Sequence, residues 1–296
     1  MLNLNPVIMK KNAMLFMCVF MGMLSCTSPS DEPQTAASGG IRQSVGQMDT
    51  LVTIQFANRD IFMQAMTRAD VSTAASRLDM WLTDGTTTTE IHQASSDADF
   101  GTASVTLNKT KTYTLYAVAH KGDAAATLED GIISFPEDKV KDTFWYTTSF
   151  SPATTTTIAC EMSRIVAMLR IETTDAVPAE AKKMRITQGS VYDRWSVTDG
   201  AMHQLDRIST INISSTNNDG TAAFSVYSIA GDPDALHTVT VEALDADDQP
   251  IQTHTFSSVP LRANHKTIFR GAFFTDEALS MSFTVGDWIE DAPISF

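Results

Sequence analysis

Short segments in which apolar and polar residues alternate recur along most of this chain, and they constrain its fold more than any other feature. The pattern is simplest where Val52, Ile54 and Phe56 are separated by the polar residues Thr53 and Gln55. Alternation with a period of two is typical of β-strands that bury one face. Helical periodicity is nearly absent, and polar turns separate the segments. We therefore predict an all-β protein made of antiparallel β-sandwiches.

A polar break near the middle of the 296-residue chain divides the expected fold in two. Residues 151–157 read Ser-Pro-Ala followed by four threonines, so we expect an N-terminal sandwich over residues 48–153 and a C-terminal sandwich over residues 154–296. Both are long enough to bury a core. After the break, residues 162–171 are apolar at odd and even positions, which indicates a central strand covered on both sides.

Two hairpins are expected from strand-like segments that follow each other closely. The first spans residues 105–119 around the turn Asn108-Lys109-Thr110, and the second spans residues 237–256 around the acidic turn at 245–250. That acidic turn resembles a calcium loop, but it lacks the glycine and the terminal acid that an EF-hand requires. We therefore expect a solvated hairpin tip there.

The N-terminus has the features of a secretory signal. Lys10 and Lys11 precede an apolar run over residues 14–26 that is too short to be a confident membrane-spanning helix. We expect residues 1–25 to be a signal peptide and residues 26–47, rich in Ser, Thr, Pro and Gly, to be a flexible tether.

The end of this run, Met-Leu-Ser-Cys at residues 23–26, resembles the bacterial lipobox, which implies that Cys26 carries lipid and holds the protein on a membrane. An ordinary cleaved signal with a chance cysteine is the alternative. The residues that follow are similar to the export tags that take Bacteroidales lipoproteins to the cell surface. Asp49-Thr50-Leu51 resembles the Bacteroidales O-glycosylation motif, which makes Thr50 a candidate site, although so short a motif also arises by chance.

Charge and motif content argue against several functional classes. The formal net charge is −14, and nucleic-acid partners require clustered basic residues, so we expect none. Catalytic, phosphate-binding and zinc-binding motifs are missing, and the six histidines are scattered. We therefore expect no enzyme, no cofactor and no metal. Cys160 would be the remaining thiol once Cys18 is removed and Cys26 is lipidated, and we expect it to be buried and inert.

Two segments of the second half carry a family resemblance. They are residues 160–171, with the pattern Met-x-Arg-x-Val-Ala from Met162, and residues 259–274, with Val-Pro, Asn-His-Lys-Thr and an aromatic-rich strand. Together with a last strand into Trp288, they resemble the Bacteroidales fimbrillin-type proteins, a family of major, anchor and accessory fimbrial subunits. The resemblance implies tandem transthyretin-like, Greek-key sandwiches, an outer-membrane lipoprotein, and assembly with other fimbrial subunits that supports adhesion to a host or bacterial surface ligand.

In polymerising members of that family, a protease cuts after an arginine that follows the first strand, and a neighbour's strand fills the groove. The resemblance makes Arg68 the candidate processing site, with Arg59 and Arg77 as rivals and an ordinary surface arginine as the alternative. The tail at 289–296 is short and partly acidic, which fits an anchor or accessory subunit better than a donor of a long strand.

A surface glycan-binding lipoprotein of a polysaccharide-uptake system is the alternative function. Its sugar platform would use exposed aromatic residues, and Trp145-Tyr146 is the most suggestive pair. An exposed coplanar pair would favour glycan binding, whereas a buried pair would leave the fimbrial hypothesis ahead. The other candidates for such a platform are Trp81, Trp195, Trp288 and Tyr192.

Overall fold

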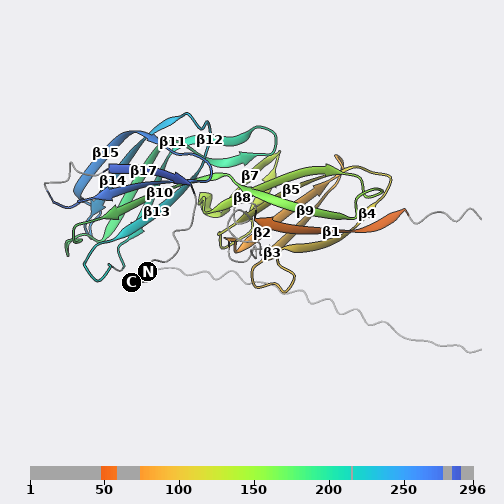
Figure 1. The fold of residues 1–296 in the computed structure, drawn as a ribbon, viewed down its shortest axis with the longest axis horizontal. Helices are drawn as coiled ribbons and strands as arrows, with labels where there is room; N and C mark the ends of the chain where they lie inside the picture. The colour runs from red at the N-terminus through yellow and green to blue at the C-terminus, as the bar shows by residue number, and fades with distance from the viewer. Residues whose placement is uncertain (1–47, 59–73, 215, 276–281, 288–296) are drawn as a thin grey trace, which may run out of the picture. The chain divides into compact units, whose positions relative to one another are not determined.

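The computed structural model describes residues 48–58, 74–214, 216–275 and 282–287, which belong to one compact unit of the chain. Apart from the short 3-10 turn η2 (Pro136–Asp138), the elements defined in these ranges are strands (Figure 1). The all-β prediction is confirmed. Within the same ranges, no helix has the length and apolar character needed to cross a membrane.

The first half of the chain forms a seven-stranded sheet in the order β3-β2-β5-β8-β9-β1-β4. Its strands are β1 (Asp49–Asn58), β2 (Arg77–Thr83), β3 (Thr88–Ala94), β4 (Thr102–Asn108), β5 (Tyr113–His120), β8 (Thr143–Phe150) and β9 (Thr157–Arg164). One hydrophobic core contains Leu78 of β2 and Leu115 of β5 together with Val52 of β1 and Ile158 of β9. The sheet therefore folds over its own core, as the alternating pattern of its strands requires.

The second half forms a ten-stranded sheet whose main path is β15-β14-β11-β13-β10-β16-β17, with β12 and β7 added to β11 and β6 added to β7. The strands are β6 (Thr127–Glu129), β7 (Ile132–Ser134), β10 (Val166–Thr173), β11 (Lys183–Ser196), β12 (Gly200–Asn212), β13 (Ala223–Ile229), β14 (Leu236–Leu244), β15 (Pro250–Pro260), β16 (His265–Gly271) and β17 (Ser282–Asp287). Leu169 and Phe269 from β10 and β16 share a second core with Ile186 and Val241 from β11 and β14.

Pairing is not antiparallel throughout, contrary to the sequence-based prediction. β1 runs parallel to β9, and β10 runs parallel to β16. Parallel neighbours need a long crossover between them, and both pairs are separated by about 90 residues or more of intervening chain, so chain length permits the arrangement.

The two sheets meet at Ile165, the residue between β9 and β10. Residues 162–171 were predicted to be one central strand, and this is wrong, because β9 ends in the first sheet and β10 begins in the second. β10 does have the expected cover on both faces at its start, where four consecutive residues are buried. A third apolar cluster surrounds this crossing, and it includes Trp81, Val118, Ile133, Phe135, Val140, Ile165 and Ile229.

The β6–β7 hairpin strengthens the connection between the sheets. It precedes β8 in the chain, but β7 pairs with the end of β11 through Ile133 opposite Trp195 and Ile132 opposite Ser196. The first half of the chain thus contributes strands to the second sheet.

One predicted hairpin is confirmed and the other is wrong. β14 and β15 pair as expected around the turn at 245–250, where the Asp245 carboxylate accepts backbone hydrogen bonds from Asp247 and Gln249. β4 and β5 exist but do not form a hairpin, since β4 pairs with β1 and β5 lies between β2 and β8. Alternation determines which face a strand buries, but it does not determine which strand lies beside it.

Cys160 is fully buried in the first core, and burial raises the pKa of its thiol to about 12. The thiol stays protonated at neutral pH, and the thiolate is the reactive form. We expect iodoacetamide to leave Cys160 unlabelled in the folded protein and to label it fully in denaturant, as measured by mass-spectrometric peptide mapping. Comparable labelling in both conditions would contradict the burial described here.

Candidate functional site

β1 lies inside the first sheet, not at its edge. It forms seven antiparallel residue pairs with β4 and six parallel pairs with β9. Val52 and Ile54 point into the core and have no exposed surface. Removing β1 would therefore uncover the backbone groups of two strands and a row of core pockets. Such a groove is the kind of site that accepts an extended strand from another chain.

Most residues of the predicted processing and lipidation sites fall beyond what the structure describes. Cys26, Arg59, Arg68 and Trp288 all lie outside the described residues. The lipidation of Cys26 and the processing at Arg68 therefore stay predictions.

Two of the predicted residues lie in strands. Arg77 begins β2, where it pairs with Ala94 on one side and His120 on the other, so its backbone is held in the sheet. Thr50, the candidate O-glycosylation residue, lies half-buried on β1 opposite Leu107. Its modification also stays a prediction.

Trp145 and Tyr146 do not form a shared aromatic platform. As neighbours on β8 they point to opposite faces, so Tyr146 packs against the first core and Trp145 against the cluster at the sheet crossing. The Trp145 ring stacks on Tyr116 with centroids 6.0 Å apart, and it meets Trp195 at the same centroid distance. Both residues are half-buried. The pair thus lacks the exposed coplanar arrangement that would favour a sugar platform.

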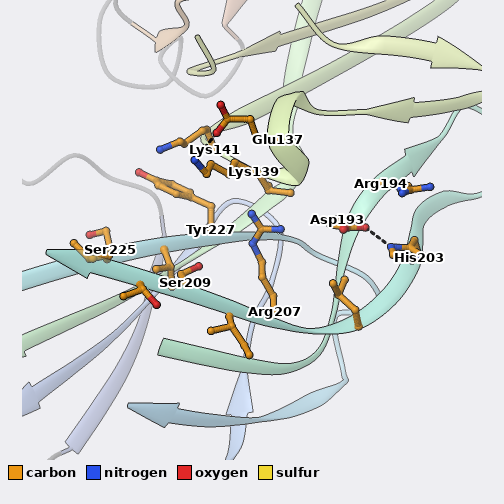
Figure 2. Close-up of a pocket in the computed structure, with 16 residues that line it drawn as sticks. Glu137, Lys139, Lys141, Asp193, Arg194, His203, Arg207, Ser209, Ser225 and Tyr227 are labelled. Carbon is orange, nitrogen blue, oxygen red and sulfur yellow. Dashed lines mark hydrogen bonds and ion pairs between the residues drawn. The ribbon is translucent and has the colours of Figure 1, made fainter. Parts of the chain in front are cut away.

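A pocket of about 640 Å³ lies between β12, β13 and the segment 137–141 that follows β7 (Figure 2). Four of its lining residues are basic, and two are acidic, in a chain whose overall charge is −14. These residues are Lys139, Lys141, Arg194, Arg207, Glu137 and Asp193. The pocket wall is therefore locally positive, against the sign of the whole protein.

Both acidic residues of the pocket wall contact a neighbouring side chain of the same wall. Glu137 forms an ion pair with Lys139. The Asp193 carboxylate, nearly buried, lies 2.7 Å from Nδ1 of His203. His203 has a positive φ of 62°, which is uncommon for a residue with a side chain, and the Asp193 contact helps to hold it. Both acidic side chains thus make contacts within the pocket wall.

The same pocket offers hydroxyl groups and apolar surface. Ser209 and Ser225 line it, together with Tyr227 and the apolar residue Val226. Burial raises the pKa of Tyr227 above its usual range near 10, and the nearby Asp142 adds to the shift, so its hydroxyl stays protonated and can donate a hydrogen bond. Figure 2 shows Lys139 and Lys141 of segment 137–141 on one side of Tyr227 and the Arg207 side chain on another.

Sequence analysis missed a buried network around Asp79. Its fully buried carboxylate accepts hydrogen bonds from the backbone N–H of Ala126 at 2.9 Å and from Nε2 of His120 at 2.9 Å, and it lies 2.8 Å from Nδ1 of His92. Nδ1 of His120 accepts from the backbone of Gly122, so Nε2 carries the proton. The signal was Asp79 itself, a charged residue between Leu78 and Met80 in an apolar strand. The network ties β3 and the loop after β5 to β2, and in the described residues no group of three or more His, Cys, Asp and Glu is placed to hold a metal.

The two segments that carried the family resemblance contact each other through Arg164. Its Nε donates to Asp142 Oδ1 at 2.7 Å, and its Nη1 donates to Asn264 Oδ1 at 2.8 Å. The guanidinium also lies over the ring of Phe144, 4.5 Å from the centroid. Arg164 ends β9 and Asn264 precedes β16, so this contact joins the first sheet to the second. Its role is structural.

The two histidines of the β14–β15 hairpin, His237 and His254, do not lie opposite each other. His237 instead pairs with Val259, and His254 pairs with Val241. The His237 side chain is buried, and its Nδ1 lies 3.0 Å from the backbone oxygen of Gly189. This contact gives the buried ring a polar partner.

These features define an all-β protein whose two sheets are joined at one residue. Its first strand lies between β4 and β9, and its second sheet borders a pocket lined by four basic and two acidic residues. Residues 124–288, more than half of the chain, match the family described as "Family of unknown function (DUF6562)", and the chain belongs to this family. The match begins just before the β6–β7 hairpin and takes in the second sheet, so it includes the strands that the first half contributes. No curated protein matches the chain.

Solved structures from Bacteroides and Porphyromonas align with this chain. A candidate polysaccharide-binding protein (DUF1812) from Bacteroides thetaiotaomicron aligns with a TM-score of 0.52 at 11% identity, over 81% of this chain and 98% of that chain. The fimbrial anchor protein Mfa2 from Porphyromonas gingivalis aligns with a TM-score of 0.42 at 10% identity, over 79% and 94%. The tip fimbrial protein Mfa3 from the same organism gives 0.41 and 12%, over 81% and 100%. At this identity, the first similarity shows a shared fold and carries no function with it.

Proposed function

We propose that this protein is a non-enzymatic subunit of surface fimbriae, either structural or an anchor or accessory subunit, which assembles with other subunits by β-strand addition and supports adhesion. In this proposal each sheet is a transthyretin-like sandwich, and a lipid on Cys26 holds the chain on the outer membrane. The observation that carries the proposal is the position of β1 between β4 and β9, with Val52 and Ile54 in the core.

The physical basis is the cost of leaving that position empty. Loss of β1 would leave unpaired the backbone groups of β4 and β9 that now face it, and buried groups without partners are costly. It would also expose the core around Val52 and Ile54 to water. A strand from a neighbouring subunit would restore both, with backbone hydrogen bonds supplying affinity and alternate side chains supplying specificity.

An arginine-specific protease tests this proposal on the purified full chain. We expect cleavage after Arg68 to give a new N-terminus at Ala69, followed by release of the β1 peptide and the appearance of oligomers on size exclusion and in electron micrographs. The variant Arg68→Ala should stay intact and monomeric, whereas the matched control Arg59→Ala should behave as the unmodified chain. Cleavage with β1 retained and no oligomer would contradict strand exchange.

The role within a fimbria is tested by the N-terminus found in cells. Mass spectrometry of sheared surface filaments and of the remaining outer membrane would identify it. A filament species that begins at Ala69 means a polymerising subunit, whereas a lipid-bearing Cys26 found in membranes with fimbrial components means an anchor or accessory subunit. A lipidated chain with no fimbrial component beside it would overturn the proposal.

A further inference from the structure

The pocket between β12, β13 and the segment 137–141 lies beside strand edges that lack a neighbouring strand. Among the described residues, β12 pairs only with β11, and β13 pairs with β10 along its length but with β11 only through Ile229. We propose that the β12 edge and this pocket form a docking site for an extended acidic segment of another protein, which adds to β12 as a further strand. Strand exchange at β1 involves the first sheet, so this second site goes beyond the function proposed above.

The backbone hydrogen bonds of β12 show which of its groups face the open edge. In an antiparallel pair, residues that bond across the pair alternate with residues that direct their N–H and C=O to the opposite edge. The N–H of Ile213 donates to the Lys182 oxygen at 2.8 Å, so the odd-numbered residues from 207 to 213 bond to β11. The backbone groups of Ile208 and Thr210 therefore point to the open edge, and both residues line the pocket.

β13 brings a second open edge to the same pocket. The N–H of Thr173 donates to the Ala222 oxygen at 2.9 Å, so the even-numbered residues of β13 bond to β10. Ser225 therefore directs its backbone groups away from β10, and it lines the pocket together with Ser209 of β12 (Figure 2). The pocket thus borders backbone groups of two strands, and an added strand is the ligand that satisfies such groups in a row.

The β12 edge is long and has little protection against pairing. β12 has 13 residues, whereas strands usually have about five or six. Residues 208–212 contain no charged residue and no proline, and the Ile208 side chain is 64% exposed. β15, at one end of the main path of the same sheet, begins with Pro250, ends with Pro260 and pairs irregularly with β14. Prolines and irregular pairing are common protections of an edge, so β12 is the edge of this pair that is open to another strand.

The charge around the pocket favours an acidic partner. Four basic and two acidic residues line it, so its formal charge is positive even with His203 neutral, in a chain whose net charge is −14. An acidic segment would be attracted to this wall, whereas a second copy docked edge to edge would bring the same positive wall and the same net negative charge. Arg207 and Tyr227 also line the pocket, but both already interact within the protein, and neither side chain is needed to bind a strand.

Titrations of the full chain with fluorescent peptides, followed by anisotropy, test the charge preference. The probe is the blocked peptide Thr-Val-Glu-Val-Glu-Val-Thr, and its counterpart has lysine in place of both glutamates. We expect the acidic peptide to bind about tenfold more tightly or better. Equal affinities, or no binding of the acidic peptide, would overturn the proposal.

Two N-methylated forms of the acidic peptide separate strand pairing from charge attraction. Methyl groups on the valine nitrogens block one edge of the extended peptide, and methyl groups on the glutamate nitrogens block the other. One edge of an added strand faces β12, so we expect one form to bind like the parent peptide and the other to lose binding. Similar affinities for the two forms would show that no strand is added.

A pair of proline variants locates the site. Thr210→Pro removes an N–H that points to the open edge, so the pairing of β12 with β11 should survive. Its ring would stand where the added strand lies, and we expect affinity for the acidic peptide to fall about tenfold or more. Thr88→Pro makes the same change at an outward-pointing position of β3, an edge strand of the first sheet, and should leave affinity unchanged.

Melting temperatures establish that both variants are folded. Ile208→Asp, at a side chain that is 64% exposed, is a second variant that should stay folded and should weaken the acidic peptide by repulsion. Unchanged affinity in Thr210→Pro and Ile208→Asp would place binding elsewhere and refute this site. Self-association of the unmodified chain that Thr210→Pro abolishes, measured by sedimentation, would assign the edge to a second copy and overturn the acidic partner. These variants leave β1 and Arg68 unchanged, so the protease test of strand exchange is decided separately.

Discussion

Arg164→Met is expected to lower the free energy of unfolding by about 3–5 kcal/mol, because it leaves the Asp142 carboxylate buried without its charged partner. Both side chains of the pair are less than a tenth exposed, and Arg164 also holds Asn264 and covers the Phe144 ring. Methionine fills much of the same volume, so the loss comes mainly from the uncompensated charge. Urea unfolding followed by tryptophan fluorescence measures the change.

A second variant separates the charge effect from packing. The double variant Arg164→Met with Asp142→Leu removes both charges and should regain most of the lost stability. Lys183→Met, which breaks the more exposed contact with Asp248, should change stability little. A small loss for Arg164→Met, similar to that for Lys183→Met, would show that the buried Arg164–Asp142 pair contributes little to stability.

Asp79→Ala is expected to cost about 3–4 kcal/mol of unfolding free energy, since it orphans several donors at once. The backbone N–H of Ala126 and the Nε2 proton of His120 both point at this carboxylate, and both lie in buried surroundings. Thermal unfolding by circular dichroism measures the loss, and hydrogen exchange at Ala126 reports it locally.

The matched control for this network is Glu90→Ala. Glu90 is more than half exposed and reaches the outer nitrogen of His92 at 3.4 Å, so its removal should leave stability nearly unchanged. If Asp79→Ala lowered the free energy of unfolding as little as Glu90→Ala, water would have to replace the carboxylate. The buried network would then contribute little to stability.

Local alternation predicted individual strands well because burial of one face is a local property. The pattern of Val52 and Ile54 predicted β1, and the residues around the turn at 245–250 predicted the β14–β15 hairpin. Pairing depends on distant residues, so β4 and β5 were wrongly joined. The crossing at Ile165 was hidden because apolar residues continue through it, and alternation does not show where a strand leaves one sheet for another.

The candidate site shows the same limit more strongly. Lys141, Arg194 and Arg207 line one pocket from three separate segments, and no spacing in the sequence links them. Arg164 and Asn264 did stand out in the sequence through the family resemblance, and the structure shows them in contact. The resemblance therefore drew attention to both residues but did not predict their contact, and no sequence pattern predicted the pocket.

The single-residue link at Ile165 has a mechanical consequence. One residue can extend by about 3.6 Å at most, so there is almost no slack between β9 and β10. Tension applied to the first sheet would pass immediately to β10, whose hydrogen bonds with β13 and β16 would resist it on both edges. The Arg164 contacts and the β7–β11 pairing lie beside this link and would share the load. A chain with this connection transmits a pull without first unravelling a linker.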